Sequence, residues 1–389
     1  MVSLFLVVLL GAYVGWSSFV VPRHALAGTL SAEAPHLAGT ATALTWPATG
    51  QAAVGAVGYG VLARHNTATT LPTASVTKLI TALCVLQKHP LQPGEAGPTI
   101  TISQQDVDSY NYYLANHGSL IAVRVGQRLS ERQAIEAMLL RSANNMADTL
   151  ARWAYGSLPA YATFANSYVA SHGLADTHVG TDASGFDPST VSTASDLVKL
   201  GEIVMQQPVL STVVGEKSVA IPESGTVRNT NNLLGQHGIV GIKTGNNDQD
   251  PGAYLLAAKY QTQGHTVTIV GAVMGAHNIS AAKQAGVQLL LSAQPNFTTR
   301  TIVAKGQTVG TYRVPWASPV AITADQDLTV FGWRGTPLST TISLKRIVSA
   351  ITPGQTVGTI TSGTATASVS LPHAVAAPPL SWRLKHPLE

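Results

Sequence analysis

The order of strand and helix patterns constrains the fold of this chain most. Two alternating segments, AYLLAAKY (253–260) and HTVTIVGAVMG (265–275), flank the short turn QTQG and predict an antiparallel hairpin. A shorter hairpin of small apolar residues is expected far upstream, at QAAVGAVGYGVLARHN (51–66). Helical patterns fill the interval between them. Helices enclosed between N-terminal and C-terminal strands predict an α+β domain in which helices pack on an antiparallel sheet.

Several helices are marked by their first residues. An apolar helix is expected from Ser75, in TASVTKLITAL, and another over NISAAKQAGVQLLLSA (278–293). Ser130 with Gln133 predicts a capping box, in which a side chain at each end of the first turn bonds the other's backbone N–H. Thr193 with Asp196 predicts a second box in front of ASDLVKLGEIVMQ.

The composition and the periodicity of the sequence change near Pro295. Beyond it the chain is rich in Thr, Val and Gly without helical periodicity, and GQTVGT occurs at 306–311 and again at 354–359, which fits the paired hairpins of a small β-rich domain. The predicted organisation is a leader at 1–27, a main domain at 28–294, a β domain at 295–375 and a Pro-rich tail at 376–389.

The leader and the composition indicate an exported protein. Charged residues make up only 11% of the chain, against about 25% in typical soluble domains. The first 21 residues have no charged side chain and are about long enough to cross a bilayer. Ala25, Leu26 and Ala27 follow as a small-residue cleavage site. We therefore expect a signal peptide or an N-terminal membrane anchor.

Other function classes find little support in the composition. The net charge of +4 comes without any Lys/Arg cluster, so nucleic acid is not an expected partner. The twelve histidines form no metal-binding pattern, so no metal or other cofactor is predicted. The single cysteine, Cys84, lies within an apolar run, where a buried hydrophobic role is expected.

The first turn of the apolar helix brings a hydroxyl and an amine together. Ser75 and Lys78 are three residues apart, so their side chains share one helix face within hydrogen-bonding reach. A lysine whose pKa is lowered can accept the proton of a serine nucleophile. Taken alone, the same residues fit an N-cap and an exposed charge.

Two later motifs change this balance. Ser142, Ala143 and Asn144 lie between two helical patterns, and Lys243, Thr244 and Gly245 end a predicted strand. The order S-x-x-K, S-x-N and K-T-G is the signature of class A β-lactamases and penicillin-binding proteins.

With these motifs and their flanks, the chain resembles the D-alanyl-D-alanine carboxypeptidases, the low-molecular-weight penicillin-binding proteins. The resemblance runs from about residue 52 to 297. It rests on PTASVTKLITAL, on GSLIAVRVGQRLS (118–130, which implies a hairpin), on DASGFDPSTVSTASDLVKLG and on NTNNLL before GIKTG. It implies a β-lactamase/transpeptidase-like domain followed by a small β-rich domain. The implied partners are peptidoglycan stem peptides and β-lactams, at the outer face of the cytoplasmic membrane or in the cell wall.

The resemblance also implies a role for each motif residue. Ser75 would be the nucleophile and Lys78 its base, while Ser142 would pass a proton to the leaving amine and Asn144 would orient Lys78. Lys243 would help to keep Lys78 neutral and, with Thr244, would bind the substrate carboxylate. Gly245 and the backbone N–H of Asn246 would complete the substrate-binding edge, with that N–H in the oxyanion hole. The turn after K-T-G, NNDQDPGAY, and GAHNISAAK, which lacks an arginine often found there, depart from the family pattern.

The motifs leave three alternatives open. An endopeptidase that cuts crosslinks shares all these motifs. A class A-like β-lactamase needs a glutamate in an E-x-x-L-N segment, and neither Glu202, Glu216 nor Glu223 has an asparagine four residues on. A non-catalytic wall-binding protein would not need the complete motif set.

Overall fold

The computed structural model describes residues 2–19, 28–30, 41–246, 251–345 and 350–386. The chain forms two compact units, one of residues 42–296 and one of residues 297–389 together with 1–41. The domain bounds expected from the sequence stay a prediction.

The unit of residues 42–296 is built on a five-stranded antiparallel sheet with strand order β10-β11-β12-β2-β3. The strands are β2 (Gln51–Ala56), β3 (Gly60–His65), β10 (Ile239–Gly245), β11 (Gly252–Thr262) and β12 (His265–Ala276). Both predicted hairpins are confirmed. Because β2 pairs with β12, the two ends of this unit meet in the middle of one sheet, which confirms the α+β class.

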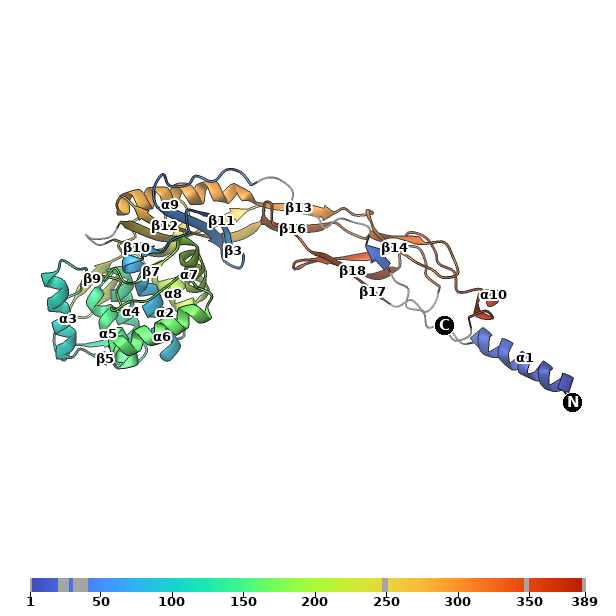
Figure 1. Ribbon diagram of the computed structural model, residues 1–389, viewed down its shortest axis with the longest axis horizontal. Helices are drawn as coiled ribbons and strands as arrows, with labels where there is room; N and C mark the ends of the chain where they lie inside the picture. Colours follow the sequence, from blue (N-terminus) through green and yellow to red (C-terminus); the bar gives the residue numbers. More distant parts are fainter. Residues whose placement is uncertain (1, 20–27, 31–40, 247–250, 346–349, 387–389) are drawn as a thin grey trace. The chain divides into compact units, whose positions relative to one another are not determined.

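Helices cover both faces of the sheet (Figure 1). On one face lies α9 (Ile279–Ala293). On the other face lie α7 (Ala194–Gln206) and the other α-helices of this unit. Gly286 of α9 lies against Leu256, and Gly201 of α7 lies against Leu255, so neighbouring residues of β11 face opposite layers. Residues 252–258 of β11 are all buried for this reason, and the expected apolar–polar alternation in this strand was wrong.

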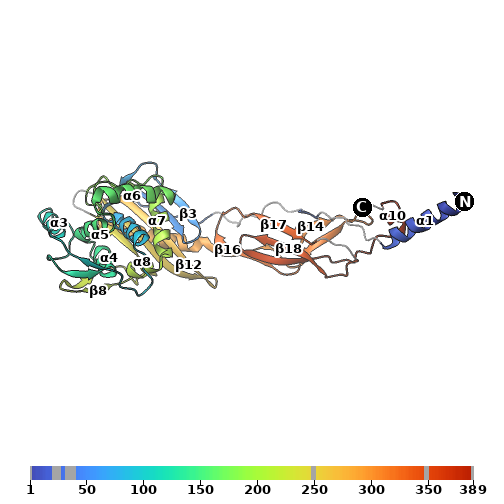
Figure 2. The same cartoon turned by 90° about the horizontal axis from the view of Figure 1, so that it is seen from below.

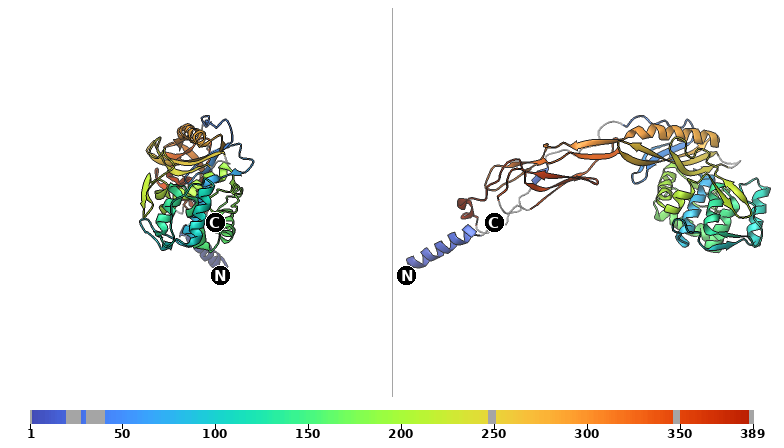
Figure 3. Two further views of the ribbon diagram at one scale, coloured as in Figure 1. Left: turned by 90° about the vertical axis from the view of Figure 1, so that its left-hand side faces the viewer. Right: turned by 180° about the vertical axis from the view of Figure 1, so that it is seen from behind.

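Further helices and short ladders complete the unit, as two views show (Figures 2 and 3). They are η1 (Ala74–Thr77), α2 (Lys78–Lys88), α3 (Gln104–Ala115), α4 (Glu131–Leu140), α5 (Asn144–Tyr155), α6 (Leu158–Ser171) and α8 (Pro208–Val213), with the strand pairs β4 (Leu71–Pro72) and β7 (Val191–Ser192), β5 (Thr99–Thr101) and β6 (Arg128–Ser130), and β8 (Ser218–Ile221) and β9 (Gly225–Arg228). Cys84 is buried in α2, as expected. Of the hairpin implied for residues 118–130, only β6 forms, and it pairs with β5 instead.

The first predicted capping box is confirmed, and only one of the two hydrogen bonds of the second is formed. Ser130 and Gln133 form the complete capping box of α4. Thr193 accepts a hydrogen bond from the Asp196 N–H, but the Asp196 carboxylate bonds the N–H of Asp176 instead of closing the box.

The unit of residues 297–389 and 1–41 is β-rich. Its six-stranded sheet has the order β1-β14-β15-β19-β18-β17, and β13 pairs separately with β16. The strands are β1 (Gly28–Leu30), β13 (Phe297–Val303), β14 (Thr308–Tyr312), β15 (Val320–Ala324), β16 (Leu328–Trp333), β17 (Thr340–Leu344), β18 (Thr356–Ser362) and β19 (Ala365–Ser370). The short helix α10 (Leu380–Arg383) follows the strands of this unit, whereas η2 (Gln294–Asn296) ends the unit of residues 42–296.

The repeated GQTVGT forms the same local structure twice. Gly306 and Gly354 have φ of 80° and 78° in tight turns, the left-handed region that favours glycine. The turns lead into β14 and β18, which lie in the same sheet.

At the N-terminus, α1 (Val2–Phe19) is a helix of 18 residues. Among the described residues, no helix has the length and apolar character needed to cross a membrane. The predicted cleavage site at Ala25, Leu26 and Ala27 lies outside the described residues.

Candidate active site

Ser75 lies in the 3-10 turn η1, which leads directly into α2. The α-helix begins at Lys78, three residues later than the sequence suggested. Ala74 has φ of +45°, a left-handed conformation that side chains rarely adopt. The hydroxyls of Thr73 and Thr77 bridge the turn at 2.6 Å. This constrained turn leaves Ser75 partly exposed while its neighbours are buried.

Lys78 is fully buried and makes three short contacts through Nζ. It lies 2.8 Å from Ser75 Oγ, which confirms the predicted Ser75–Lys78 contact. It also donates to Asn144 Oδ1 at 2.7 Å and to the Ser184 carbonyl at 2.8 Å. The last two partners are carbonyl oxygens, which can only accept. A neutral amine therefore satisfies both with its two hydrogens and turns its lone pair to the Ser75 hydroxyl.

Burial lowers the pKa of Lys78 from about 10.5 to about 7, because a buried ammonium loses its hydration. The carboxylates of Asp182 and Asp148 oppose this effect. Burial, and not the charge of Lys243, is the main cause of the lowered pKa. The suggestion that Lys243 keeps Lys78 neutral stays a prediction.

The S-A-N turn joins the two buried lysines. Ser142 follows α4 with φ of +64°, and Asn144 begins α5. Lys243 Nζ, from β10, donates to Ser142 Oγ at 3.0 Å and to the Thr244 carbonyl at 2.8 Å. Burial first, and then the charges of Lys78 and Lys283, hold the pKa of Lys243 well below its usual value. One end of the turn thus contacts Lys78 and the other Lys243.

The end of β10 runs close to the nucleophile turn. The hydroxyls of Thr244 and Thr230 are 2.8 Å apart. A Cβ at Gly245 would lie 2.9 Å from the Thr73 carbonyl oxygen and 3.2 Å from Val76. Any side chain there would push the strand away from the turn that holds Ser75, so this close approach requires glycine.

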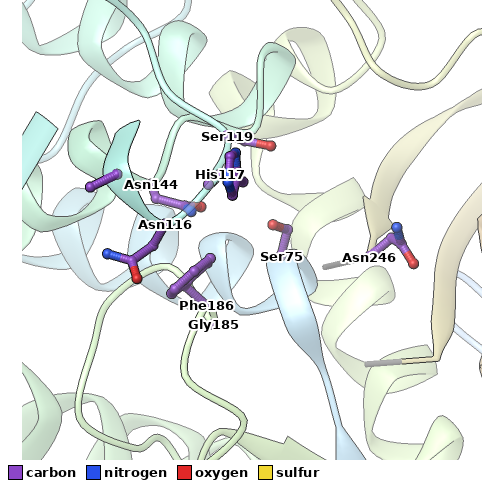
Figure 4. Close-up of a pocket in the computed structure, with 10 residues that line it drawn as sticks. Ser75, Asn116, His117, Ser119, Asn144, Gly185, Phe186 and Asn246 are labelled. Atoms are coloured by element: carbon purple, nitrogen blue, oxygen red, sulfur yellow. The ribbon is translucent and has the colours of Figure 1, made fainter. Parts of the chain in front are cut away.

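A cavity of about 440 Å³ opens over Ser75 (Figure 4). Ser75 lies between Asn246, which follows β10, and Asn144 with the loop after α3. The cavity is lined by Ser75, Asn144 and Asn246 from the predicted set, and by Ala115, Asn116, His117, Gly118, Ser119, Gly185 and Phe186, which sequence reasoning did not name as site residues. The quoted segments GSLIAVR and DASGFD adjoin or contain most of these additional residues.

One partly buried acid, Asp182, organises the loop that carries Gly185 and Phe186. A single oxygen of Asp182, Oδ1, accepts from the backbone N–H groups of Ser184 and Gly185 at 2.5 and 2.7 Å. The Ser184 carbonyl then bonds Lys78. Asp182 therefore holds both a wall of the cavity and one partner of the candidate base.

The three candidates for the glutamate that a class A β-lactamase needs have other partners. Glu202 accepts from the N–H groups of Gly58 and Gly60 in the β2–β3 turn. Glu216 pairs with Arg132 and Glu223 with Arg124, at 2.9 and 2.6 Å. None of the three lines the cavity over Ser75.

No group of His, Cys, Asp or Glu side chains that could hold a metal ion occurs within the described residues. The cavity itself presents hydroxyl, amide, imidazole and backbone groups, with two lysines beneath it. This chemistry suits nucleophilic attack on a carbonyl by serine.

Comparisons with known proteins place residues 41–278 in a sequence family described as D-alanyl-D-alanine carboxypeptidase. One curated relative is the D-alanyl-D-alanine carboxypeptidase DacD of Salmonella typhimurium, 29% identical over 68% of this chain and 66% of that protein. A D-alanyl-D-alanine endopeptidase of Pseudomonas aeruginosa is 33% identical over 45% of this chain and 54% of its own length. The chain therefore spans about two thirds or less of these curated relatives.

Solved structures share the fold. Penicillin-binding protein 6B from Escherichia coli has a TM-score of 0.62 and 21% identity, covering 88% of this chain and 99% of that one. The agreement extends the confirmed fold class to a β-lactamase/transpeptidase-like domain with a β-rich region after it.

Proposed function

Since the chain belongs to the D-alanyl-D-alanine carboxypeptidase family, we propose that it removes the terminal D-alanine from peptidoglycan stem peptides through an acyl-enzyme on Ser75. The observation that carries this proposal is the contact of 2.8 Å between Ser75 Oγ and the fully buried Nζ of Lys78. A lysine with a pKa of about 7 is neutral in a large fraction of molecules near neutral pH. It is then a base close to the operating pH, where proton transfer is most effective.

In the proposed first step, Ser75 Oγ bonds to the carbonyl carbon of the penultimate D-alanine and its proton passes to Lys78 Nζ. The amide C–N bond then breaks, and the leaving nitrogen takes the proton from Lys78, relayed by Ser142. Free D-alanine departs and leaves an ester on Ser75. Water hydrolyses this ester and restores the serine hydroxyl.

The remaining motif residues are proposed to bind and stabilise. Lys243 and Thr244 hold the terminal carboxylate of the substrate, and Asn144 orients Lys78. Gly245 allows strand β10 to approach the turn that holds Ser75. The backbone N–H groups of Ser75 and Asn246 receive the developing oxyanion. Removal of one such donor typically costs about 2.7 to 4 kcal/mol of transition-state stabilisation.

A β-lactam ring is also an acyl donor, so β-lactams are proposed as covalent inhibitors. The partners of Glu202, Glu216 and Glu223 favour slow deacylation over a β-lactamase activity. The charge-poor composition and uncharged N-terminal segment support export to the outer face of the membrane or the cell wall. Contact with the membrane through the N-terminal segment belongs to the same proposal.

The test uses the full chain with a pentapeptide that ends in D-Ala-D-Ala, and with a fluorescent penicillin. We expect release of D-alanine and stable covalent labelling, both abolished in Ser75→Ala because the nucleophile is lost. The control Ser167→Ala changes an exposed serine on α6 and should behave as the native protein. Undiminished labelling of Ser75→Ala would remove Ser75 from the proposed role.

A further inference from the structure

The acylation steps leave one buried acid of the unit of residues 42–296 unused. Asp148 lies within α5 and has only 5% of its surface exposed. It forms no ion pair within the described residues, and Arg152, one turn further along α5, pairs with Asp106 at 2.7 Å instead. The Asp148 oxygen Oδ1 has no hydrogen-bond partner in the same part of the chain. A buried carboxylate with so little compensation is costly, so its presence requires an explanation.

The other oxygen of Asp148 accepts two hydrogen bonds. They come from the hydroxyls of Ser109 at 2.8 Å and Tyr113 at 3.0 Å, both on α3. Burial raises the pKa of Tyr113 well above its usual value, so the phenol keeps its proton and donates it. Burial also raises the pKa of Asp148, while these two hydrogen bonds and the charge of Arg152 favour its ionised form.

Two short paths connect Asp148 with Lys78. Along α5, Asp148 lies one turn after Asn144, whose side-chain oxygen accepts from Lys78 Nζ at 2.7 Å, and side chains four residues apart share one helix face. Through α3, the Tyr113 hydroxyl lies 3.5 Å from Ser184 Oγ, and the Ser184 carbonyl accepts from Lys78 Nζ at 2.8 Å. Both paths place the carboxylate directly behind groups that bond the amine.

The other charged and titratable groups around Asp148 and Lys78 are tied to further partners. Asp182 raises the pKa of Lys78 more than Asp148 does, but it also bonds the backbone N–H groups of the cavity loop. Lys243 bonds Ser142. On the neighbouring helices, Glu136 pairs with Arg132, Glu131 lies against Gly97, and the Tyr161 hydroxyl lies 2.7 Å from that of Thr81. Asp148 is therefore the acid whose charge can be removed with the least disturbance of the site.

We infer that Asp148 is a positioning residue for the proposed base: its buried negative charge stabilises the ammonium form of Lys78 and so sets the pH range in which Ser75 is acylated. This inference rests on the proposed function of the same site. Asp148 acts through its charge and needs no contact with the substrate, because buried charges are screened much less than exposed ones. Without that charge, Lys78 loses its proton at lower pH, so the protein becomes more active in mild acid.

The experiment uses the full chain and measures the rate of labelling by a fluorescent penicillin between about pH 5 and pH 9. Asp148→Asn removes the charge and keeps the size of the side chain. Asp148→Ala removes the same charge without adding an amide that needs partners, in case the asparagine variant does not fold. Asp196→Asn is the matched control, because Asp196 is also buried but is paired with Lys199 on α7. Circular dichroism checks folding.

In the native protein the labelling rate should rise with an apparent pKa of about 7. In the Asp148 variants this apparent pKa should fall by about one unit, the effect of losing a nearby opposite charge. At about pH 5.5 they should reach a fraction of their own plateau rate up to about tenfold larger than the native protein does. A purely structural role would lower the rate at every pH without moving the midpoint. Asp196→Asn should keep the native midpoint.

A second measurement follows the amine without any reaction. The carbon-13 chemical shift of Lys78 Cε, identified by its loss in Lys78→Arg, reports the protonation of Nζ directly. Its midpoint should fall by the same amount in the Asp148 variants and should stay unchanged in Asp196→Asn.

The inference is overturned if a folded Asp148 variant titrates with the native midpoint or a higher one, or if Asp196→Asn lowers the midpoint equally. A native protein that is not labelled, or undiminished labelling of Ser75→Ala, would instead contradict the proposed function. The chemical shift of Lys78 Cε would still test the effect of Asp148 in that case, so the two failures are distinguishable.

Discussion

The two units of the chain differ most in what they bury. Residues 42–296 bury two lysines, Lys78 and Lys243, together with carboxylates such as Asp148 and Glu131. In residues 297–345 and 350–386 no charged side chain is buried, and the core is a cluster of aliphatic and aromatic residues around Tyr312 and Ile322. Removing a charge from water costs several kcal/mol unless partners compensate. Because only the first unit buries charged groups at this free-energy cost, the catalytic residues are expected there.

The largest effect is expected from the buried amine. Lys78→Arg keeps a positive charge but removes the proton acceptor, because arginine stays protonated in proteins. Acylation by penicillin should fall by about 10²- to 10⁴-fold, the usual contribution of a general base. The rate of covalent labelling measures it. Lys88→Arg, at the exposed end of the same helix, is the control.

A Lys78→Arg variant that keeps a tenth or more of the native acylation rate would point to another base. The contrast between the two units would then lose its main functional support, since the buried lysine would be structural.

Separating the units should have a much smaller effect on acylation. All six proposed catalytic and carboxylate-binding side chains precede residue 245, so a protein of residues 42–296 should fold and react with penicillin within a few fold of the full chain. Activity on intact cell wall should drop further, because reach towards a polymer is lost. Circular dichroism checks folding, and labelling checks reaction. A folded fragment that takes up no penicillin would show that the β-rich unit contributes to the active site.

The smallest expected effect is on thermal stability and comes from a buried carboxyl group without hydrogen-bond partners. Glu131 is fully buried, neither of its carboxylate oxygens has a hydrogen-bond partner among the described residues, and burial raises its pKa to about 7. The neutral carboxyl therefore contributes fully to the free energy of unfolding below about pH 4.5, the pKa of the group in the unfolded chain. This contribution is lost as the pH rises to about 7, the pKa in the folded protein.

Glu131→Gln stays neutral, so its Tm should exceed the native value by about 2–4 °C at pH 8, an effect near 1 kcal/mol, and should match it at pH 4.5. Thermal unfolding at the two pH values measures this. Glu223→Gln, an exposed partner of Arg124, should show no such gain. Equal Tm values of the Glu131 variant and native protein at both pH values would contradict the account of Glu131.

The sequence could predict the sheet and the motifs but not their environment. The hairpin of β11 and β12, the helix α9 and the capping box at Ser130 follow from local patterns. The polar helix α3 was missed because only Asp106 and Tyr113 of its residues are buried, so it lacks an apolar stripe.

In the active site, too, local contacts could be predicted from the sequence and long-range contacts could not. The spacing of Ser75 and Lys78 predicted their contact, because helical geometry is local. The burial of Lys78 depends on segments far apart in the chain, such as the loop that contains Ser184. The cavity wall at His117 and Phe186 comes from irregular segments, which carry no periodic signal.

The pH dependence of acylation tests the central claim most directly, that neutral Lys78 is the base for Ser75. The fraction of neutral amine grows as the pH rises through its pKa, so labelling by penicillin should increase about tenfold per pH unit below the pKa and level off above it. We predict a single rise with an apparent pKa of about 7. An acylation rate that stays constant between about pH 5.5 and pH 8.5 would contradict the account, because a base titrating in that range could not leave it unchanged.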